Sequence, residues 1–147
     1  MKKQKIITIC SSASFFKEAL EIEEKLRKMG FKVKLPYTAT KMKKSGDFRV
    51  ETYKTWFKNP NVYSRKTWLV KNHIRKVIDC DAVLITNYKK KGIPGYIGGN
   101  TLIEMTIAFH YKKPIYILNP ISKKLMYEEE IYALQPVFLN GDLSLIS

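Results

Sequence analysis

A glycine-rich loop followed by a glutamate is the clearest chemical feature of this sequence. The loop, residues 88–100, contains four glycines, and the helix predicted to begin at Thr101 carries Glu104 about one turn in. Adjacent Gly98 and Gly99 allow a ligand to approach the backbone closely, and a helix N-terminus directs free N–H groups at such a ligand. A carboxylate at this position either interacts with the helix dipole or attacks a cationic sugar carbon. Spacing alone leaves both roles open.

Two other polar groups are candidates for the same site. Ser11 and Ser12 directly follow an apolar run, residues 5–10, and His73 lies at the edge of the apolar face of a predicted helix. An imidazole with an unperturbed pKa near 6.5 can protonate a leaving base. A single histidine at the edge of an apolar face is also typical of a hydrogen-bonded core or rim residue. Both interpretations of His73 remain open.

The spacing of apolar residues indicates the elements that must position these groups. Apolar runs bounded by turn residues predict strands at residues 5–10, 31–35, 82–87, 114–118 and 137–139. Helical periodicity and breaker residues predict helices over 14–29, 64–79, from 101 onward and over 126–134, with Ser14 and Ser64 as N-caps. The alternation predicts an α/β, doubly wound, flavodoxin-like domain with a five-stranded parallel sheet. Ligands bind such sheets beyond the carboxyl ends of the strands, so we expect the candidate groups to converge there.

Composition sets the class of protein. The 147 residues suffice for one domain, residues 1–147. Hydrophobic residues make up 45% of the chain and charged residues 27%, which excludes disordered and low-complexity proteins. No apolar run approaches the roughly 18 residues of a membrane span, and the start does not read as a signal peptide, so we expect a cytoplasmic protein without membrane contact. Cys10 and Cys80 lack zinc-ligand spacing; they are expected to be buried thiols, with a disulfide as the alternative.

The positive charge is concentrated in one third of the chain. Formal net charge is +14, and residues 41–91 hold 14 Lys or Arg against four acidic residues. Such a field attracts anions, of which phosphate is the commonest in cells. Within it, residues 37–63 form an insert after the second strand, which we interpret as a loop with a helical turn. Its aromatic residues are Tyr37, Phe48, Tyr53, Trp56, Phe57 and Tyr63, and its basic residues include Lys41, Lys43, Lys44, Arg49, Lys54 and Lys58.

Three roles for this insert remain open. Interleaved aromatic and basic side chains, continuing into Arg65 and Lys66, are able to bind single-stranded nucleic acid. The same residues would serve equally as a lid over a mononucleotide, because long ordered loops in compact domains are usually functional. A solvated basic face is the third alternative.

Five segments together resemble the nucleoside 2-deoxyribosyltransferase superfamily, which also contains the 2′-deoxynucleoside 5′-monophosphate N-glycosidases. The segments are Ile9–Ser12, Asp81–Asn87, Tyr96–Ala108, Lys113–Ile115 and Glu130–Leu143. The likeness is strongest to short archaeal and bacterial members. It covers nearly the whole chain apart from the basic insert and implies a 2-deoxyribosyltransferase-like domain over residues 1–147.

The resemblance implies a catalytic pair. Glu104 matches the nucleophilic glutamate that attacks C1′ and releases the base. His73 stands eight residues before Asp81, where characterised members carry an aspartate that handles the base and its leaving-group proton.

The resemblance also implies substrate contacts. Ser11 and Ser12 match first-loop residues near the sugar and any 5′-phosphate. Gly98 stands where those enzymes use Asp or Ser, and Gly99 and Asn100 complete the same substrate-binding loop.

Two further residues are substrate-binding candidates. Asp81 leads its strand, and the residues themselves favour a bond from its carboxylate to neighbouring backbone N–H groups. Asn140 matches a C-terminal asparagine lent by a neighbouring subunit, so the resemblance implies a homodimer or dimer-based oligomer.

Several functions follow from this likeness. The first is cleavage or transfer at the N-glycosidic bond of a (deoxy)nucleoside or its 5′-monophosphate through Glu104, with no metal and no cofactor. Another is a nucleoside-monophosphate phosphoribohydrolase, since Gly98–Glu104 is similar to the Gly-Gly-x-Gly-Thr-x-x-Glu loop of cytokinin-activating hydrolases, although one residue short. A non-catalytic nucleotide- or nucleic-acid-binding module is favoured by the departures at His73 and Gly98 and opposed by the retention of Glu104.

Overall fold

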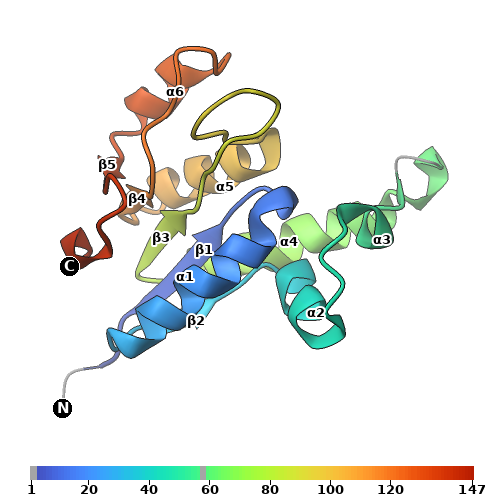
Figure 1. Cartoon of the computed structure of the whole chain (residues 1–147), viewed down its shortest axis with the longest axis horizontal. Helices are drawn as coiled ribbons and strands as arrows, with labels where there is room; N and C mark the ends of the chain where they lie inside the picture. The colour runs from blue at the N-terminus through green and yellow to red at the C-terminus, as the bar shows by residue number, and fades with distance from the viewer. Residues whose placement is uncertain (1–2, 57–58) are drawn as a thin grey trace.

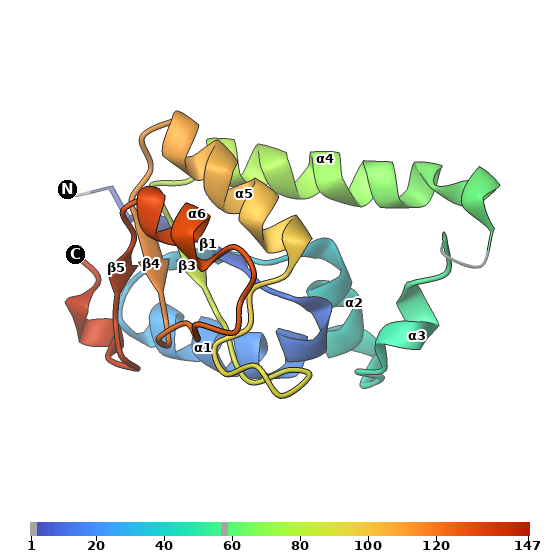
Figure 2. The same cartoon turned by 90° about the horizontal axis from the view of Figure 1, so that it is seen from above.

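The chain folds as a parallel β-sheet between two layers of helices (Figures 1 and 2). The structure is a computed structural model that describes residues 3–56 and 59–147. The strands are β1 (Ile6–Cys10), β2 (Lys32–Lys34), β3 (Ala82–Ile85), β4 (Ile115–Ile117) and β5 (Val137–Phe138). The α-helices are α1 (Phe16–Lys28), α2 (Tyr37–Ser45), α3 (Val50–Tyr53), α4 (Ser64–Ile78), α5 (Gly99–His110) and α6 (Glu128–Ala133). Short 3₁₀ turns are η1 (Ala13–Phe15), η3 (Pro60–Val62) and η4 (Leu143–Leu145).

The sheet confirms the predicted fold class. Its strand order is β2-β1-β3-β4-β5 and every neighbouring pair is parallel. In the centre, Ile7 is paired with Val33 on one side and Ala82 on the other. The strand order reverses between β1 and β3, and a doubly wound sheet binds its ligands at such a switch point.

The central strand, β3, is buried on both faces, which explains its continuous apolar sequence. Ala82 and Leu84 pack on the side of α1 and α2, whereas Val83 and Ile85 pack on the side of α5. Figure 2 shows α1 on one side of the sheet and α4 and α5 together on the other. A parallel strand that is covered on both faces has no polar side to alternate with its apolar one.

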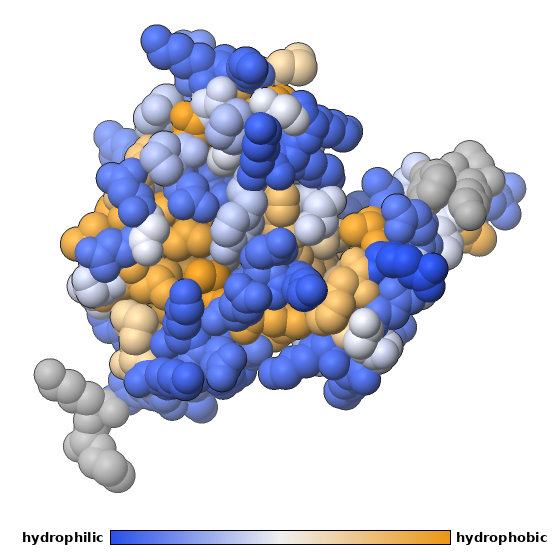
Figure 3. Space-filling view, in the orientation of Figure 1, coloured by the Kyte–Doolittle hydropathy of each residue, from blue (hydrophilic) through white to orange (hydrophobic). Residues whose placement is uncertain are grey.

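An arm extends from the sheet at its β2 edge. It consists of α2, α3, η3 and the N-terminal half of α4. Of these, α2 packs against the α1 side of the core, whereas α3 and the N-terminal end of α4 project away from the strands (Figure 1). Figure 3 shows that hydrophilic side chains cover much of this arm, with hydrophobic ones visible between the arm and the body. The arm contains most of the insert, residues 37–63.

The prediction that the insert is mainly a loop is wrong, because nine of its residues form α2. Ala39 and Met42 of this helix are fully buried in the α1-side core. Gly46 ends the helix with a φ of 74°, a left-handed conformation that glycine adopts without strain. Ala39 and Met42 are the two buried residues of α2, and Lys41, Lys43 and Lys44 beside them hide the helical period. Phe57 and Lys58 lie outside the described residues.

The two predicted serine caps are also wrong. Ser14 lies inside η1, and α1 begins after Phe15 without a side-chain cap. Ser64 is the first residue of α4 rather than its cap. The helix bearing Glu104 begins at Gly99, two residues before the predicted start. The stop at Gly30, by contrast, is confirmed by its φ of 98°.

Cys10 and Cys80 are free and buried, as expected. Among the described residues, no helix combines the length and the apolar character that a membrane crossing requires.

Candidate active site

A cavity of about 240 Å³ lies beyond the carboxyl ends of the central strands. Its walls come from the segment after β1, the glycine-rich loop with the start of α5, one face of α4, and the insert. The convergence expected for Ser11, Ser12, His73 and Glu104 is therefore observed, and Gly98, Gly99 and Asn100 line the same cavity. The insert contributes residues from α2, α3 and the segment after α3, so part of it forms a wall of the cavity.

Glu104 is almost completely enclosed at the inner end of this cavity. Glu104 is only 4% exposed, and its Oε2 accepts a hydrogen bond from Asn100 Nδ2 at 3.3 Å. Burial raises the pKa of Glu104 from 4.5 to about 8, against the opposing effects of the Lys66 ammonium and the Cys10 thiol. Near neutral pH the carboxyl group is therefore mostly protonated. It becomes a nucleophile only when it loses this proton.

His73 is buried beside Glu104 rather than exposed at a rim. Its Nε2 donates to the carbonyl oxygen of Ile9 at 3.0 Å in the tautomer that satisfies this contact. Burial, followed by repulsion from Lys76, lowers the pKa of His73 to about 4. Near neutral pH the imidazole is consequently uncharged, which argues against the predicted role as a general acid. Its Nδ1 is buried and has no hydrogen-bond partner within residues 3–56 and 59–147.

Cys10 is a third buried group at this point, and sequence reasoning missed it as a site residue. Its thiol interacts with the Glu104 carboxyl group, and burial raises the pKa of the thiol well above its usual range. The ligand atoms of Cys10, His73 and Glu104 lie within 4.8 Å of one another. A divalent metal would find three suitable donors here, but His73 would have to give up its bond to Ile9 to offer Nε2.

The two serines differ in what they offer to a ligand. Ser11 donates from its Oγ to the carbonyl oxygen of Thr86 at 2.8 Å, which ties the segment after β1 to the end of β3. Ser12 Oγ accepts a hydrogen bond from Lys90 Nζ at 3.2 Å, and Lys90 also lies over the Tyr96 ring. Ser12 and Lys90 together form a polar, positively charged part of the cavity wall.

The glycine that the loop requires is Gly95 rather than Gly98 or Gly99. Gly95 has a φ of 62°, and a Cβ there would lie 1.9 Å from the carbonyl oxygen of Pro120. The glycine-rich loop therefore passes very close to the segment after β4. Asn87 joins the two segments by donating from Nδ2 to the carbonyl oxygens of Gly95 and Asn119. Gly98 has a φ of −82°, and a Cβ there would make only ordinary contact with the Tyr96 ring. Neither Gly98 nor Gly99 has a positive φ, so neither needs to be glycine for its backbone conformation.

Basic and aromatic side chains from the arm complete the cavity. Lys54 and Lys66 line it, and Lys66 Nζ lies 5.3 Å from the centre of the buried Trp56 ring. Three lysines and one glutamate are thus the charged side chains of the cavity lining among the described residues. Sequence reasoning noted these basic and aromatic residues but had no way to place them opposite Glu104.

Asp81, a predicted substrate-binding residue, lies outside the lining of this cavity. It precedes β3 at the amino end of the sheet, where its Oδ2 accepts a hydrogen bond from the Ile6 backbone N–H at 2.7 Å. This is the backbone role that the residues themselves favoured. Asn140 is exposed outside the cavity lining of its own chain, with a φ of 50°.

The comparisons with known proteins give a likeness in fold. No protein-family model matches the sequence, and a search of curated proteins finds no match. The structure is similar to that of a 2-deoxyribosyltransferase from the psychrotolerant bacterium Bacillus psychrosaccharolyticus, with a TM-score of 0.53 and 17% sequence identity. The match covers 83% of this chain and 77% of that one. At this level of identity, the likeness shows that the two proteins share a fold.

Proposed function

We propose that this protein cleaves or transfers the N-glycosidic bond of a (deoxy)nucleoside or its 5′-monophosphate, with Glu104 as the nucleophile. The observation that carries the proposal is the enclosed Glu104 carboxyl group at the carboxyl ends of β1 and β3. The fold that this chain shares with a 2-deoxyribosyltransferase also supports the proposal.

The proposed reaction begins with ionised Glu104. One carboxylate oxygen forms a bond to C1′ of the sugar while the C1′–N bond breaks, and the base leaves with the bonding electron pair and takes a proton from solvent water. Water, or a second base, then attacks C1′ and loses a proton to solvent, and the bond between C1′ and Glu104 breaks to release the carboxylate. Neutral His73 does not supply the proton as an imidazolium, so we assign it a structural role, in which its hydrogen bond to the Ile9 carbonyl oxygen holds α4 against β1.

The charges of the cavity favour an anionic substrate. Lys54, Lys66 and Lys90 line the cavity, whereas Glu104 is its single acidic group among the residues that the structure describes. A 5′-phosphate placed near Ser12 and Lys90 would gain charge-assisted hydrogen bonds. We therefore propose the nucleoside 5′-monophosphate as the preferred substrate and the arm as a wall that encloses it.

One experiment tests the activity directly. Purified protein is incubated with a panel of nucleosides and 5′-monophosphates, with and without a second free base, and base release is followed by chromatography. Release of a base that disappears in Glu104→Gln supports the proposal, and formation of a new nucleoside identifies transfer. Binding of a nucleotide without base release by the wild-type protein would instead identify a non-catalytic module.

A further inference from the structure

Lys66 lies on the same face of α4 as His73. Lys66, Leu69 and His73 are spaced by three and four residues, which places them on one side of a helix, and all three line the cavity. His73 Nε2 is 4.0 Å from Glu104 Oε1. This face of α4 therefore directs the Lys66 ammonium group toward the cavity. Glu104 lines the same cavity at its inner end.

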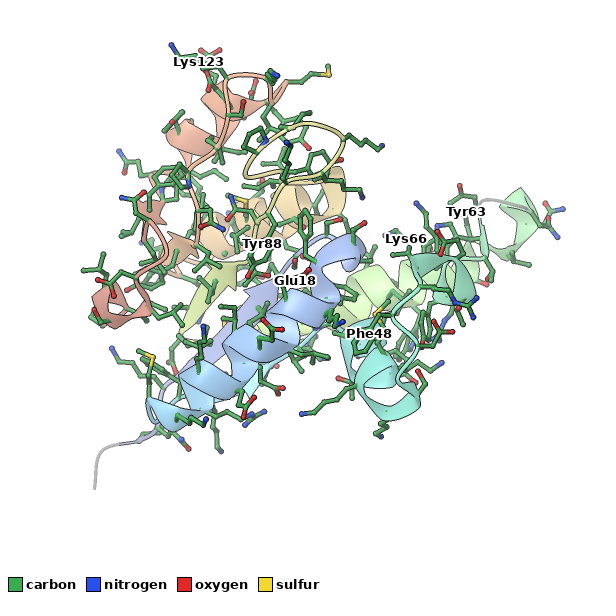
Figure 4. All side chains as sticks on the ribbon, viewed as in Figure 1. Glu18, Phe48, Tyr63, Lys66, Tyr88 and Lys123 are labelled. Carbon is green, nitrogen blue, oxygen red and sulfur yellow. The ribbon has the colours of Figure 1, made fainter. Side chains whose placement is uncertain are left out.

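Lys66 lies against another residue of the arm, Trp56. Its Nζ lies 5.3 Å from the centre of the Trp56 ring, and Trp56 is only 8% exposed. A cation over an indole face is attracted by the ring electrons, and the attraction is stronger where water is partly excluded. Figure 4 shows Lys66 on the arm, where α4 leaves the body of the protein.

The charged and titratable groups that act on Glu104 come from three elements. Cys10 on β1 and His73 on α4 are buried beside it, and both are uncharged near neutral pH. Glu104 itself is on α5, where Asn100 contributes a neutral amide. Lys66 is the cation whose attraction acts on Glu104, whereas Lys54 acts on Lys66 by repulsion.

We propose that Lys66 is a positioning residue whose ammonium group, held on Trp56, supplies the positive charge that stabilises the Glu104 carboxylate across the cavity. The arm is then coupled to the chemistry, because the segment that encloses the substrate also holds this charge. The catalytic consequence rests on the proposed function, but the electrostatic relation between the two side chains does not.

The test measures the charge state of Glu104 without any substrate. Protein labelled with ¹³C at the glutamate side-chain carboxyl carbon is titrated by NMR between pH 5 and 10, and Glu104→Gln identifies the signal. Lys66→Met should move the Glu104 midpoint upward by about half a unit to one unit, which is about a three- to tenfold change in ionisation. Lys66→Arg should restore the wild-type midpoint.

Lys71→Met is the matched control, because Lys71 is an exposed residue of α4 outside the cavity lining. It removes the same charge from the same helix and should leave the midpoint unchanged. An unchanged midpoint in Lys66→Met, or equal shifts in the two methionine variants, would overturn the proposal. If the shift is found but the wild-type protein releases no base, the proposed function fails and the Lys66–Glu104 relation stands.

If the wild-type protein releases a base, a kinetic measurement adds a second readout. Lys66→Met should lower kcat/KM by about three- to tenfold below the Glu104 midpoint and have little effect above it, where the carboxylate is fully formed. An equal loss at every pH would indicate a substrate contact rather than stabilisation of the carboxylate, and would overturn the positioning role.

Discussion

His73 Nε2 lies 4.0 Å from Glu104 Oε1, and the two residues are each only 4% exposed. Burial shifts their pKa values in opposite directions, to about 4 for His73 and to about 8 for Glu104. Between these values both side chains are uncharged, so the contact is not an ion pair at neutral pH. At neutral pH Glu104 is therefore protonated and His73 is not, and Glu104 must lose its proton before it can act as a nucleophile.

Replacement of the nucleophile is the first prediction. Glu104→Gln keeps the size of the side chain but prevents formation of the covalent intermediate, so turnover should fall by about a thousandfold or more. In the wild type, kcat/KM should rise with pH until Glu104 is ionised, near pH 8. The control is Glu129→Gln, since Glu129 is exposed on α6. Wild-type turnover in the Glu104 variant would contradict the mechanism.

The raised pKa of Glu104 also predicts a pH-dependent cost to stability. The unfolded chain releases the Glu104 proton near its ordinary pKa of 4.5, whereas the folded protein holds it until about pH 8. Stability is therefore lost progressively as pH rises between these values, and each unit of difference is worth about 1.4 kcal/mol. Glu104→Gln removes this loss.

Thermal unfolding of the wild type and Glu104→Gln at pH 5 and pH 8 checks this prediction. The variant should gain stability relative to the wild type between the two pH values. His73 has the opposite dependence, because its lowered pKa costs stability as pH falls from about 6.5 to about 4. This contribution is present in both proteins and cancels in the comparison. A stability difference that does not change with pH would show that Glu104 has an ordinary pKa in the folded state.

The elements that carry Glu104 could be predicted from the sequence because their signals are local. The apolar run of β3 and the glycine-rich loop before α5 indicate a buried strand and a turn without any knowledge of their neighbours. The alternation of strands and helices then determines that the carboxyl ends of the strands lie at one edge. This is why Ser12 and Glu104 were expected to meet, and they do line one cavity.

The groups that surround Glu104 could not be predicted, because they depend on long-range packing. Nothing in the sequence distinguishes Cys10 from the other buried residues of β1. Its contact with Glu104 forms only when α5 packs over the strand. Trp56 and Lys66 are ten residues apart and meet through the path of the arm. Asp81 is different, because its bond to a backbone N–H was favoured from its place before a strand, although the donor, Ile6 on the neighbouring strand, is known only from the fold.

The close crossing at Gly95 predicts a strong and specific effect on stability. Gly95→Ala would place a Cβ 1.9 Å from the carbonyl oxygen of Pro120 in a left-handed backbone conformation. The loop must therefore shift, and we expect a loss of at least about 2 kcal/mol in the free energy of unfolding. Gly99→Ala is the control, because a Cβ there meets nothing within 4 Å. Denaturant unfolding of the two variants should separate them clearly, and equal stabilities would refute the assignment of Gly95 as the required glycine.

The outer faces of the helices predict self-association. Ile103 and Phe109 of α5 are 50% and 49% exposed, and Tyr111 follows at the end of the same helix with similar exposure. Exposed apolar side chains on one helix are typical of a surface that packs against a partner. We expect a homodimer or a dimer-based oligomer by light scattering at micromolar concentration, and Phe109→Glu should shift it toward monomer. A monomeric wild type at that concentration would contradict this expectation.

The last prediction concerns the 5′-phosphate, for which Ser12 and Lys90 are the proposed contacts. Their hydrogen bond of 3.2 Å places a hydroxyl and an ammonium group side by side on the cavity wall. Burial, with repulsion from Lys91 and Lys54, lowers the pKa of Lys90, and a phosphate dianion would offset that repulsion. Calorimetry should therefore show tighter binding of a deoxynucleoside 5′-monophosphate than of the corresponding nucleoside.

Salt separates this local site from the general positive field of the protein. Attraction between exposed charges is screened beyond about 8 Å at physiological ionic strength, whereas short hydrogen bonds inside the cavity are much less affected. The preference for the monophosphate should persist at high salt, fall in Ser12→Ala and Lys90→Met, and remain in Lys89→Met, since Lys89 is exposed outside the cavity lining. Equal affinity for nucleoside and monophosphate would indicate a transferase acting on free nucleosides, because the phosphate would then make no specific contact. Tight binding of oligonucleotides alone would instead assign the arm to nucleic acid, with its aromatic side chains stacking on successive bases.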